Sequence, residues 1–171
     1  MKQLTHNKIQ NRQKKFPITL VCDKIRTPEN IGMCFRIAES FGVEKIYLHE
    51  NSAPLENKKI QRTARNTINQ VAADRYSDFN QLVKQLKSEG NIIVGLEITD
   101  TSKPIKNFNF TSHRKIVLIL GSERNGISDV NLLDQSIEIP MYGQNSSMNV
   151  IHSLAIALYE ITNQLNNLSS T

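Results

Sequence analysis

Residues 116–128 read Ile-Val-Leu-Ile-Leu-Gly-Ser-Glu-Arg-Asn-Gly-Ile-Ser, an apolar strand-like run that ends in a loop with two glycines. Gly121 and Gly126 have four residues between them, which is nearly the spacing of a phosphate-binding P-loop. However, Ile127 stands where a P-loop has its lysine, and the carboxylate of Glu123 would repel a triphosphate. We therefore expect this loop to hold something other than the phosphates of a nucleotide, or to hold no ligand.

Strands and helices alternate on both sides of this stretch. The pattern before it predicts a strand at 18–22, a helix from Pro28 to Gly42, a strand at 45–49, helices at 55–66 and 77–88, and a strand at 91–97. After a polar connection at 99–114 and the quoted strand, we expect a short helix near 128–133, a strand at 136–139 and a long helix at 148–165. Thr27, Ser77 and either Ser146 or Ser147 are the expected N-caps of three of these helices. The alternation predicts an α/β fold with a mostly parallel sheet, helices on both of its faces, and ligands at the C-terminal ends of the strands.

The composition is that of one ordinary globular domain. The chain has 171 residues, and no internal repeat or linker divides it. No apolar run approaches the ~20 residues that cross a membrane, and the N-terminus lacks the apolar core of a signal peptide, so we expect a cytoplasmic protein. Cys22 and Cys34 lack zinc-ligand spacing and are expected to be buried thiols, and the four histidines also show no metal-binding spacing. We therefore expect no metal.

The net charge of +5 is concentrated at the N-terminus. Residues 1–15 carry five basic residues and no acid, whereas the remaining 16 basic residues balance 16 acidic ones. The chain thus divides into a basic arm at 1–15 and a single neutral domain at 16–171. Such an arm indicates either contact with nucleic acid or another polyanion, or only a solvated terminus.

The long helix at 148–165 is apolar nearly all round. Ile151, Leu154, Leu158, Ile161 and Leu165 form one stripe, and much of the remaining surface is also apolar. A helix of this kind must be covered on more than one side, so we expect a second subunit to pack on it.

Three polar stretches follow or adjoin predicted strands and could carry chemistry. They centre on Asn30 and Arg36, on the loop with Gly121 and Glu123, and on residues 139–150. Each has a plainer interpretation taken alone: helix capping, a surface ion pair, or neutralisation of a neighbouring charge.

Taken together, the three stretches closely resemble the signature motifs of the SPOUT superfamily of RNA methyltransferases, in its SpoU (TrmH-like) branch. The first motif is matched by Asn30, Arg36 and Phe41-Gly42, the second by Leu120, Gly121, Glu123 and Gly126, and the third by Ile139-Pro140-Met141, Ser147, Asn149 and Val150. The resemblance spans about residues 18–165 with order and spacing intact. We therefore expect a minimal catalytic domain without an added RNA-binding domain.

The resemblance implies a fold whose C-terminal part forms a trefoil knot, and a homodimer that packs through the last helix. It also implies the cofactor S-adenosylmethionine and methyl transfer to the ribose 2′-hydroxyl of structured RNA. We expect tRNA rather than rRNA, because a compact substrate needs less docking surface. A base methyltransferase on the same fold and a non-catalytic RNA-binding module are the alternatives.

The resemblance also assigns roles to residues. Cofactor binding falls to the glycine loop and its neighbours, namely Leu96, Gly121, Ile139, Ser147 and Met148. The catalytic set is Arg36 with Asn30, Glu123, Ser147 and Asn149. RNA phosphates are expected to contact Lys14, Lys15, Lys58, Arg62 and Arg65, the last three of which share one face of the predicted helix at 55–66. Because a guanidinium rarely gives up its proton, we expect Arg36 to act electrostatically on the ribose oxygen, on broadly the same side of its helix as Asn30.

Overall fold

The computed structural model describes residue 11 and residues 13–167, so most of the predicted basic arm lies outside the described residues. The strands are β1 (Phe16–Cys22), β2 (Val43–His49), β3 (Ala72–Tyr76), β4 (Ile92–Leu96), β5 (Lys103–Pro104), β6 (Ile116–Leu120) and β7 (Gln135–Glu138). The α-helices are α1 (Pro28–Ser40), α2 (Lys58–Ala64), α3 (Phe79–Ser88) and α4 (Val150–Asn167). Short 3-10 helices occur at η2 (Arg65–Gln70), η3 (Ile105–Asn107), η4 (Phe110–Ser112) and η5 (Val130–Leu132).

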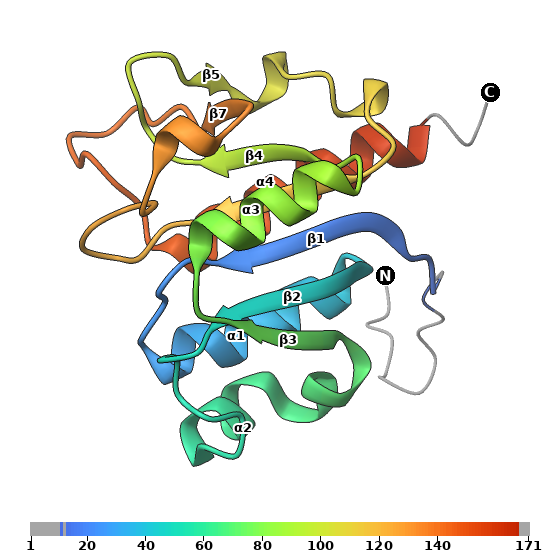
Figure 1. Cartoon of the computed structure of the whole chain (residues 1–171), viewed down its shortest axis with the longest axis vertical. Helices are drawn as coiled ribbons and strands as arrows, with labels where there is room; N and C mark the ends of the chain where they lie inside the picture. Colours follow the sequence, from blue (N-terminus) through green and yellow to red (C-terminus); the bar gives the residue numbers. More distant parts are fainter. Residues whose placement is uncertain (1–10, 12, 168–171) are drawn as a thin grey trace, which may run out of the picture.

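Within the described residues, the strands form one seven-stranded sheet in the order β3-β2-β1-β6-β4-β7-β5, and every strand pair is parallel (Figure 1). The quoted strand β6 lies at the centre, between β1 and β4, with Leu120 opposite both Cys22 and Leu96. Because the strands run in one direction, their C-terminal ends meet at a single edge of the sheet.

Strand β6 is apolar throughout because both of its faces are covered. Its alternate residues Ile116, Leu118 and Leu120 join a core cluster with residues of α1 and α4, whereas Val117 and Ile119 join a second cluster with α3. All five side chains are fully buried. Figure 1 shows α3 in front of the sheet and α1 and α4 behind it. The predicted parallel sheet with helices on both faces is therefore confirmed.

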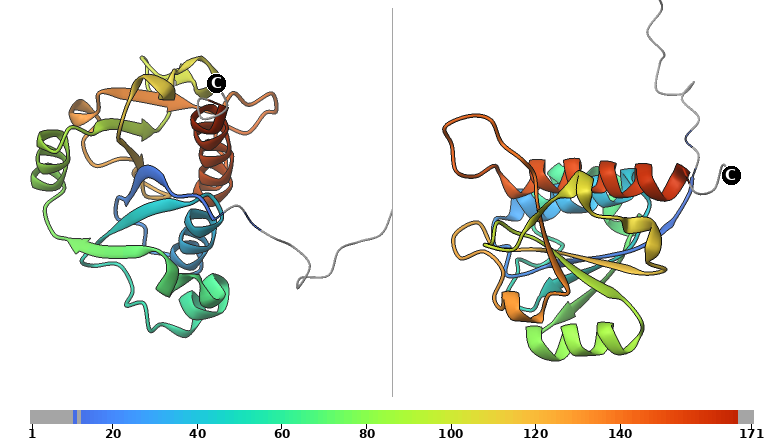
Figure 2. Two further views of the ribbon diagram at one scale, coloured as in Figure 1. Left: turned by 90° about the vertical axis from the view of Figure 1, so that its right-hand side faces the viewer. Right: turned by 90° about the horizontal axis from the view of Figure 1, so that it is seen from above.

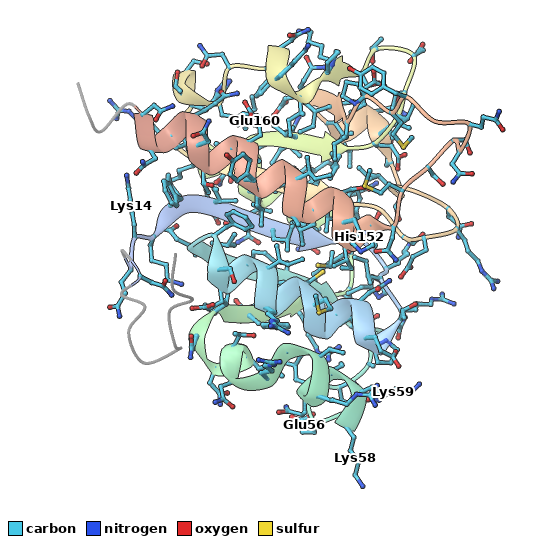
Figure 3. All side chains as sticks on the ribbon, turned by 180° about the vertical axis from the view of Figure 1, so that it is seen from behind. Lys14, Glu56, Lys58, Lys59, His152 and Glu160 are labelled. Atoms are coloured by element: carbon cyan, nitrogen blue, oxygen red, sulfur yellow. The ribbon has the colours of Figure 1, made fainter. Side chains whose placement is uncertain are left out.

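Helix α4 is covered on only part of its circumference. Ile151, Leu154 and Ile161 are buried against the sheet side, whereas Ile156 and Tyr159 are 40% and 63% exposed. Figure 3 shows α4 beside α1, and the two helices together make up much of one face of the molecule. The apolar surface of α4 that the fold leaves uncovered lies on this face.

Several details of the sequence-based prediction were wrong. Strands β3 and β5 were missed, because β3 is a mostly polar outer strand and β5 has only two residues. The short helix expected near 128–133 is only the 3-10 turn η5. Thr27 stands at the N-cap of α1 without a side-chain cap bond, and α3 is capped by Asp78, not Ser77. Asn149, rather than Ser146 or Ser147, caps α4, since its Oδ1 accepts from the Ile151 amide at 2.8 Å.

Candidate functional site

A cavity of about 410 Å³ lies at the C-terminal edge of the sheet, a size suited to a small organic ligand. The ends of β4, β6 and β7 and the segment before α4 form its walls. The residues that line it include Leu96, Glu97, Gly121, Glu123, Ile139, Met141, Ser147, Met148, Asn149 and Ser153. All five residues expected to bind the cofactor are among them. The second and third motifs thus meet at one cavity.

The glycine loop is closed by backbone hydrogen bonds. The Ser122 amide donates to the Gly126 carbonyl at 3.0 Å, and the Gly126 amide donates back to the Ser122 carbonyl at 3.1 Å. Gly126 has a φ of +64°, which favours glycine, and a Cβ at Gly121 would lie only 2.3 Å from the Gly126 carbonyl carbon. Both glycines are therefore required by the tight turn itself.

A buried carboxylate holds the far end of this loop. Asp23, directly after β1, is fully buried, and its oxygens accept from the Ser128 amide at 2.5 Å, the Ser128 hydroxyl at 3.1 Å and the Tyr76 hydroxyl at 3.2 Å. Burial and the negative charge of Asp23 raise the pKa of Tyr76 well above its usual range, so this phenol stays a donor. Sequence reasoning missed Asp23, although an acid directly after an apolar strand was the available signal.

Glu97, directly after β4, provides a second anchor. Its Oε2 accepts from the Ile127 amide at 3.1 Å, next to the Ser128 amide that Asp23 binds. Two carboxylates from two strands therefore fix consecutive amides of one segment, and the cavity wall formed by the glycine loop is held in place.

Asn30 and Glu123, from the first and second motifs, are in contact. The Asn30 side-chain amide donates to Glu123 Oε1 at 2.5 Å, so the start of α1 reaches the glycine loop. Glu123 lines the cavity, and Asn30 lies directly behind it.

Arg36 does not follow Asn30 to this position. Six residues of α-helix rotate a side chain by about 600°, so Arg36 lies about 120° around α1 from Asn30. Arg36 lies on the same side of α1 as Glu29, which is seven residues earlier. The carboxylate of Glu29 pairs with Lys59 of α2 at 3.1 Å. Arg36 is not among the residues that line the cavity. The expectation that Asn30 and Arg36 lie on broadly the same side is therefore not met within one chain.

The charges around the cavity favour a cation. Glu97, Glu123 and Glu138 line it, whereas Arg124 is the one basic residue among the described lining residues. The positively charged sulfonium and amine of S-adenosylmethionine suit such a lining. The apolar side chains of Leu96 and Ile139 and the backbone of Gly121, which also line the cavity, suit its adenosine part. A triphosphate would meet net repulsion here.

Comparison with known proteins agrees with this geometry. The model of the SpoU rRNA Methylase family matches residues 17–159. The chain belongs to this family. A 23S rRNA (guanosine-2'-O-)-methyltransferase RlmB of Nitrosomonas europaea is 28% identical over 86% of this chain, which spans 56% of that relative's length.

Solved structures of SpoU-type enzymes share the fold. The A. aeolicus TrmH/SpoU tRNA modifying enzyme superposes with a TM-score of 0.81 at 24% identity, over 92% of this chain and 79% of that one. A structure described as giving insights into the 2-OH methylation of C/U34 on tRNA superposes with a TM-score of 0.77 at 22% identity, over 88% of this chain and 97% of that one.

The expected RNA contacts of this SpoU domain fall into two groups. Lys58, Arg62 and Arg65, in α2 and at its C-cap, are exposed, and Figure 3 shows Lys58 pointing away from the body. Lys14 and Lys15 are instead engaged within the domain. Lys14 Nζ lies 4.8 Å from the Phe16 ring centroid, and Lys15 Nζ donates to the Val43 carbonyl at 3.2 Å.

Other expectations concern metals, membranes and thiols. Residue 11 and residues 13–167 contain no cluster of three or more His, Cys, Asp or Glu side chains that could hold a metal ion. No helix in this part of the SpoU chain is long and apolar enough to span a membrane. Cys22 and Cys34 are both buried, as predicted, with their sulfurs 3.9 Å apart.

Proposed function

We propose that this protein transfers a methyl group from S-adenosylmethionine to a ribose 2′-hydroxyl of structured RNA. The observation that carries the proposal is the cavity at the sheet edge, where the glycine loop and the segment before α4 meet, with Asn30 bonded to Glu123 behind it. The relatives named above modify RNA, and one is a guanosine 2′-O-methyltransferase.

The residues around the cavity divide the work of binding and orientation. When bound, S-adenosylmethionine supplies an electrophilic methyl group. Gly121 lets the backbone approach the cofactor, and Leu96, Ile139 and Met148 provide apolar walls. Glu123 orients the substrate or its partner side chains, with Asn30 fixing its carboxylate, and Ser147 and Asn149 offer neutral hydrogen bonds to the ribose.

We also propose a homodimer that packs through α4. The exposed Ile156 and Tyr159 supply the apolar surface, and Ser153 of the same helix lines the cavity. A partner on this face would therefore lie close to the site. Because Arg36 does not reach the cavity of its own chain, we propose that it serves the cavity of the partner, where a cation favours the anionic form of the attacking oxygen.

The proposed substrate is tRNA in preference to rRNA. The solved structure concerned with methylation of tRNA matches this chain over 97% of its own length, which supports the choice of tRNA. Lys58, Arg62 and Arg65 are proposed to meet RNA phosphates. We further propose that the segment between β7 and α4 takes part in a trefoil knot, and that the protein acts in the cytoplasm, where its substrate lies.

The experiment that tests the function uses total RNA from a strain that lacks the gene. The purified protein and S-[methyl-³H]adenosylmethionine are expected to label tRNA at a nucleotide whose 3′ linkage becomes resistant to alkaline cleavage. Label that stays in an alkali-sensitive nucleotide would identify a base methyltransferase instead. Calorimetry with S-adenosylmethionine tests the remaining alternative, a non-catalytic RNA-binding module. Such a module would give neither heat of cofactor binding nor methyl transfer.

A further inference from the structure

A second hollow, of about 810 Å³, adjoins the cofactor cavity. The segment between β7 and α4 forms it, and this segment extends beyond the N-terminal end of α4 (Figure 2). Met141, Ser147 and Met148 line both the hollow and the cavity, so the two share a wall.

Tyr142 is the aromatic residue among those that line this hollow. Its side chain is 95% exposed, more than any other large hydrophobic residue that the structure describes. Neither its hydroxyl nor the side-chain amides of Gln144 and Asn145 make a hydrogen bond to any residue of 13–167. An aromatic ring and two amides therefore face solvent beside the site of methyl transfer, with their binding capacity unused.

The lining of the hollow offers no cation to pair with a phosphate. It consists of Pro140, Met141, Tyr142, Gly143, Gln144, Asn145, Ser147 and Met148, none of which is charged. An aromatic face with neutral amides instead matches a nucleobase, which offers a π surface for stacking and a polar edge for hydrogen bonds.

We infer that this hollow receives the base of the nucleotide whose ribose is methylated, stacked on Tyr142, with Gln144 and Asn145 facing the base edge. The inference rests on the proposed function. A ribose with its 2′-hydroxyl at the cofactor cavity carries its base only one bond away, and the shared wall places the hollow within that reach. Recognition of unstacked bases by aromatic side chains is a usual mode of RNA binding.

Steady-state methylation of the same RNA tests the stacking. Tyr142→Ala is expected to raise KM for RNA, or lower kcat/KM, on the order of 10- to 100-fold, as for loss of one base–aromatic stack. Tyr142→Phe, which keeps the ring, is expected to stay within about twofold of the wild type. The affinity for S-adenosylmethionine, measured by calorimetry, should not change in either variant. Val130→Ala, at another exposed apolar side chain outside both cavities, is the matched control.

A fluorescence measurement tests the contact directly, since the chain contains no tryptophan. Tyr142→Trp places a single fluorophore in the hollow, and Val130→Trp places one elsewhere. Binding of RNA is expected to quench the first saturably and to leave the second unchanged. The inference would be overturned if RNA bound in a filter assay without quenching the Tyr142→Trp variant, or if Tyr142→Ala kept both the wild-type KM and the wild-type kcat/KM. In either case, methyl transfer by the wild type would leave the proposed function standing. Absence of methyl transfer by the wild type would instead overturn the function.

Discussion

The side-chain amide of Asn30 donates a 2.5 Å hydrogen bond to Glu123, joining residues that are 93 positions apart in the chain. Glu123 lines the cavity, and Asn30 stands behind it at the start of α1. Glu123 is exposed and Asn30 is half-buried, so this bond contributes little to folding and instead orients a carboxylate at the site.

Asn30→Ala and Glu123→Gln are therefore expected to impair the reaction and not the fold. Each should lower kcat by about 10- to 100-fold, the range of one hydrogen bond to a charged group. Each should change the free energy of unfolding by less than about 1 kcal/mol, measured by urea denaturation. Because the two act as one unit, the double variant should be little worse than either single variant. Fully multiplicative losses would show that Asn30 acts without Glu123.

Because Asp23 anchors the glycine loop, its substitution is expected to weaken both folding and cofactor binding. In Asp23→Asn, the amide N–H₂ would face either the Ser128 amide, which can only donate, or the Ser128 and Tyr76 hydroxyls, which would have to turn from donating to accepting. The variant is expected to lose about 1–3 kcal/mol of unfolding free energy and to bind S-adenosylmethionine roughly tenfold more weakly by calorimetry.

Asp134→Asn is the matched control for that substitution. Asp134 accepts from the Ile93 amide at 2.8 Å and pairs with Lys87, but it does not line the cavity. It should lose stability and keep the wild-type affinity for S-adenosylmethionine. If Asp23→Asn also kept that affinity, the role of Asp23 would be limited to folding.

The sequence predicted the central part of the fold well because its signals are local. The run at 116–120 and the helical spacing of Ile31, Phe35 and Ala38 each fix an element without knowledge of the rest. Strand β3 gave no such signal, since its Ala-Ala-Asp-Arg-Tyr sequence is mostly exposed and pairs only with β2.

The sequence motifs predicted the residues that line the cavity, but they did not predict the contacts between segments that are far apart in the chain. The five expected cofactor residues all line the cavity. The bonds of Asp23 to Ser128 and Tyr76 depend on the order of strands in the sheet, which no local pattern encodes. The position of Arg36 was misjudged for a simpler reason, because a six-residue separation rotates a side chain away from its starting face.

The buried phenol of Tyr76 leads to a prediction about alkaline pH. Burial and the Asp23 charge raise its pKa in the folded protein, so the folded state holds this proton more tightly than the unfolded chain. Its stabilising contribution is complete below the unfolded pKa of about 10 and is lost as the pH rises above that value. Tyr76→Phe should therefore show a smaller fall in unfolding free energy between neutral pH and pH ~11 than the wild type, measured by urea denaturation.

The thiol of Cys34 should also contribute stability that is lost at alkaline pH. Its hydrogen bond with Cys22 and its burial raise its pKa well above the usual range. Tyr76→Phe should therefore still lose some unfolding free energy as the pH rises into the alkaline range. An unchanged decline in that variant would show that the Tyr76 proton does not contribute.

The uncovered surface of α4 predicts the assembly. Tyr159→Lys places a charge in the exposed apolar patch with Ile156. We expect it to convert a dimer into monomers in analytical ultracentrifugation, because a charge buried in an apolar interface costs several kcal/mol. Val130→Lys, which changes an exposed apolar residue away from α4, should remain dimeric. A wild-type protein that sediments as a monomer at micromolar concentration would contradict the proposed dimer.

The placement of Arg36 predicts complementation between two variants that each lack one group of the site. Arg36→Ala lacks the proposed cation, and Glu123→Gln lacks the carboxylate of the cavity. If Arg36 serves the cavity of its partner, a mixed dimer contains one cavity with an intact Glu123 and an intact Arg36, and one cavity that lacks both. Unfolding and refolding the two variants together should then restore about a quarter of wild-type methyl transfer, since half of the dimers are mixed and each has one working site. Refolding each variant alone is the control and should restore no more than the residual activity of that variant, which for Glu123→Gln is about a tenth of the wild type or less. If Arg36 acted within its own chain, every cavity of the mixed dimer would lack one of the two groups, and the mixture would stay as inactive as its components.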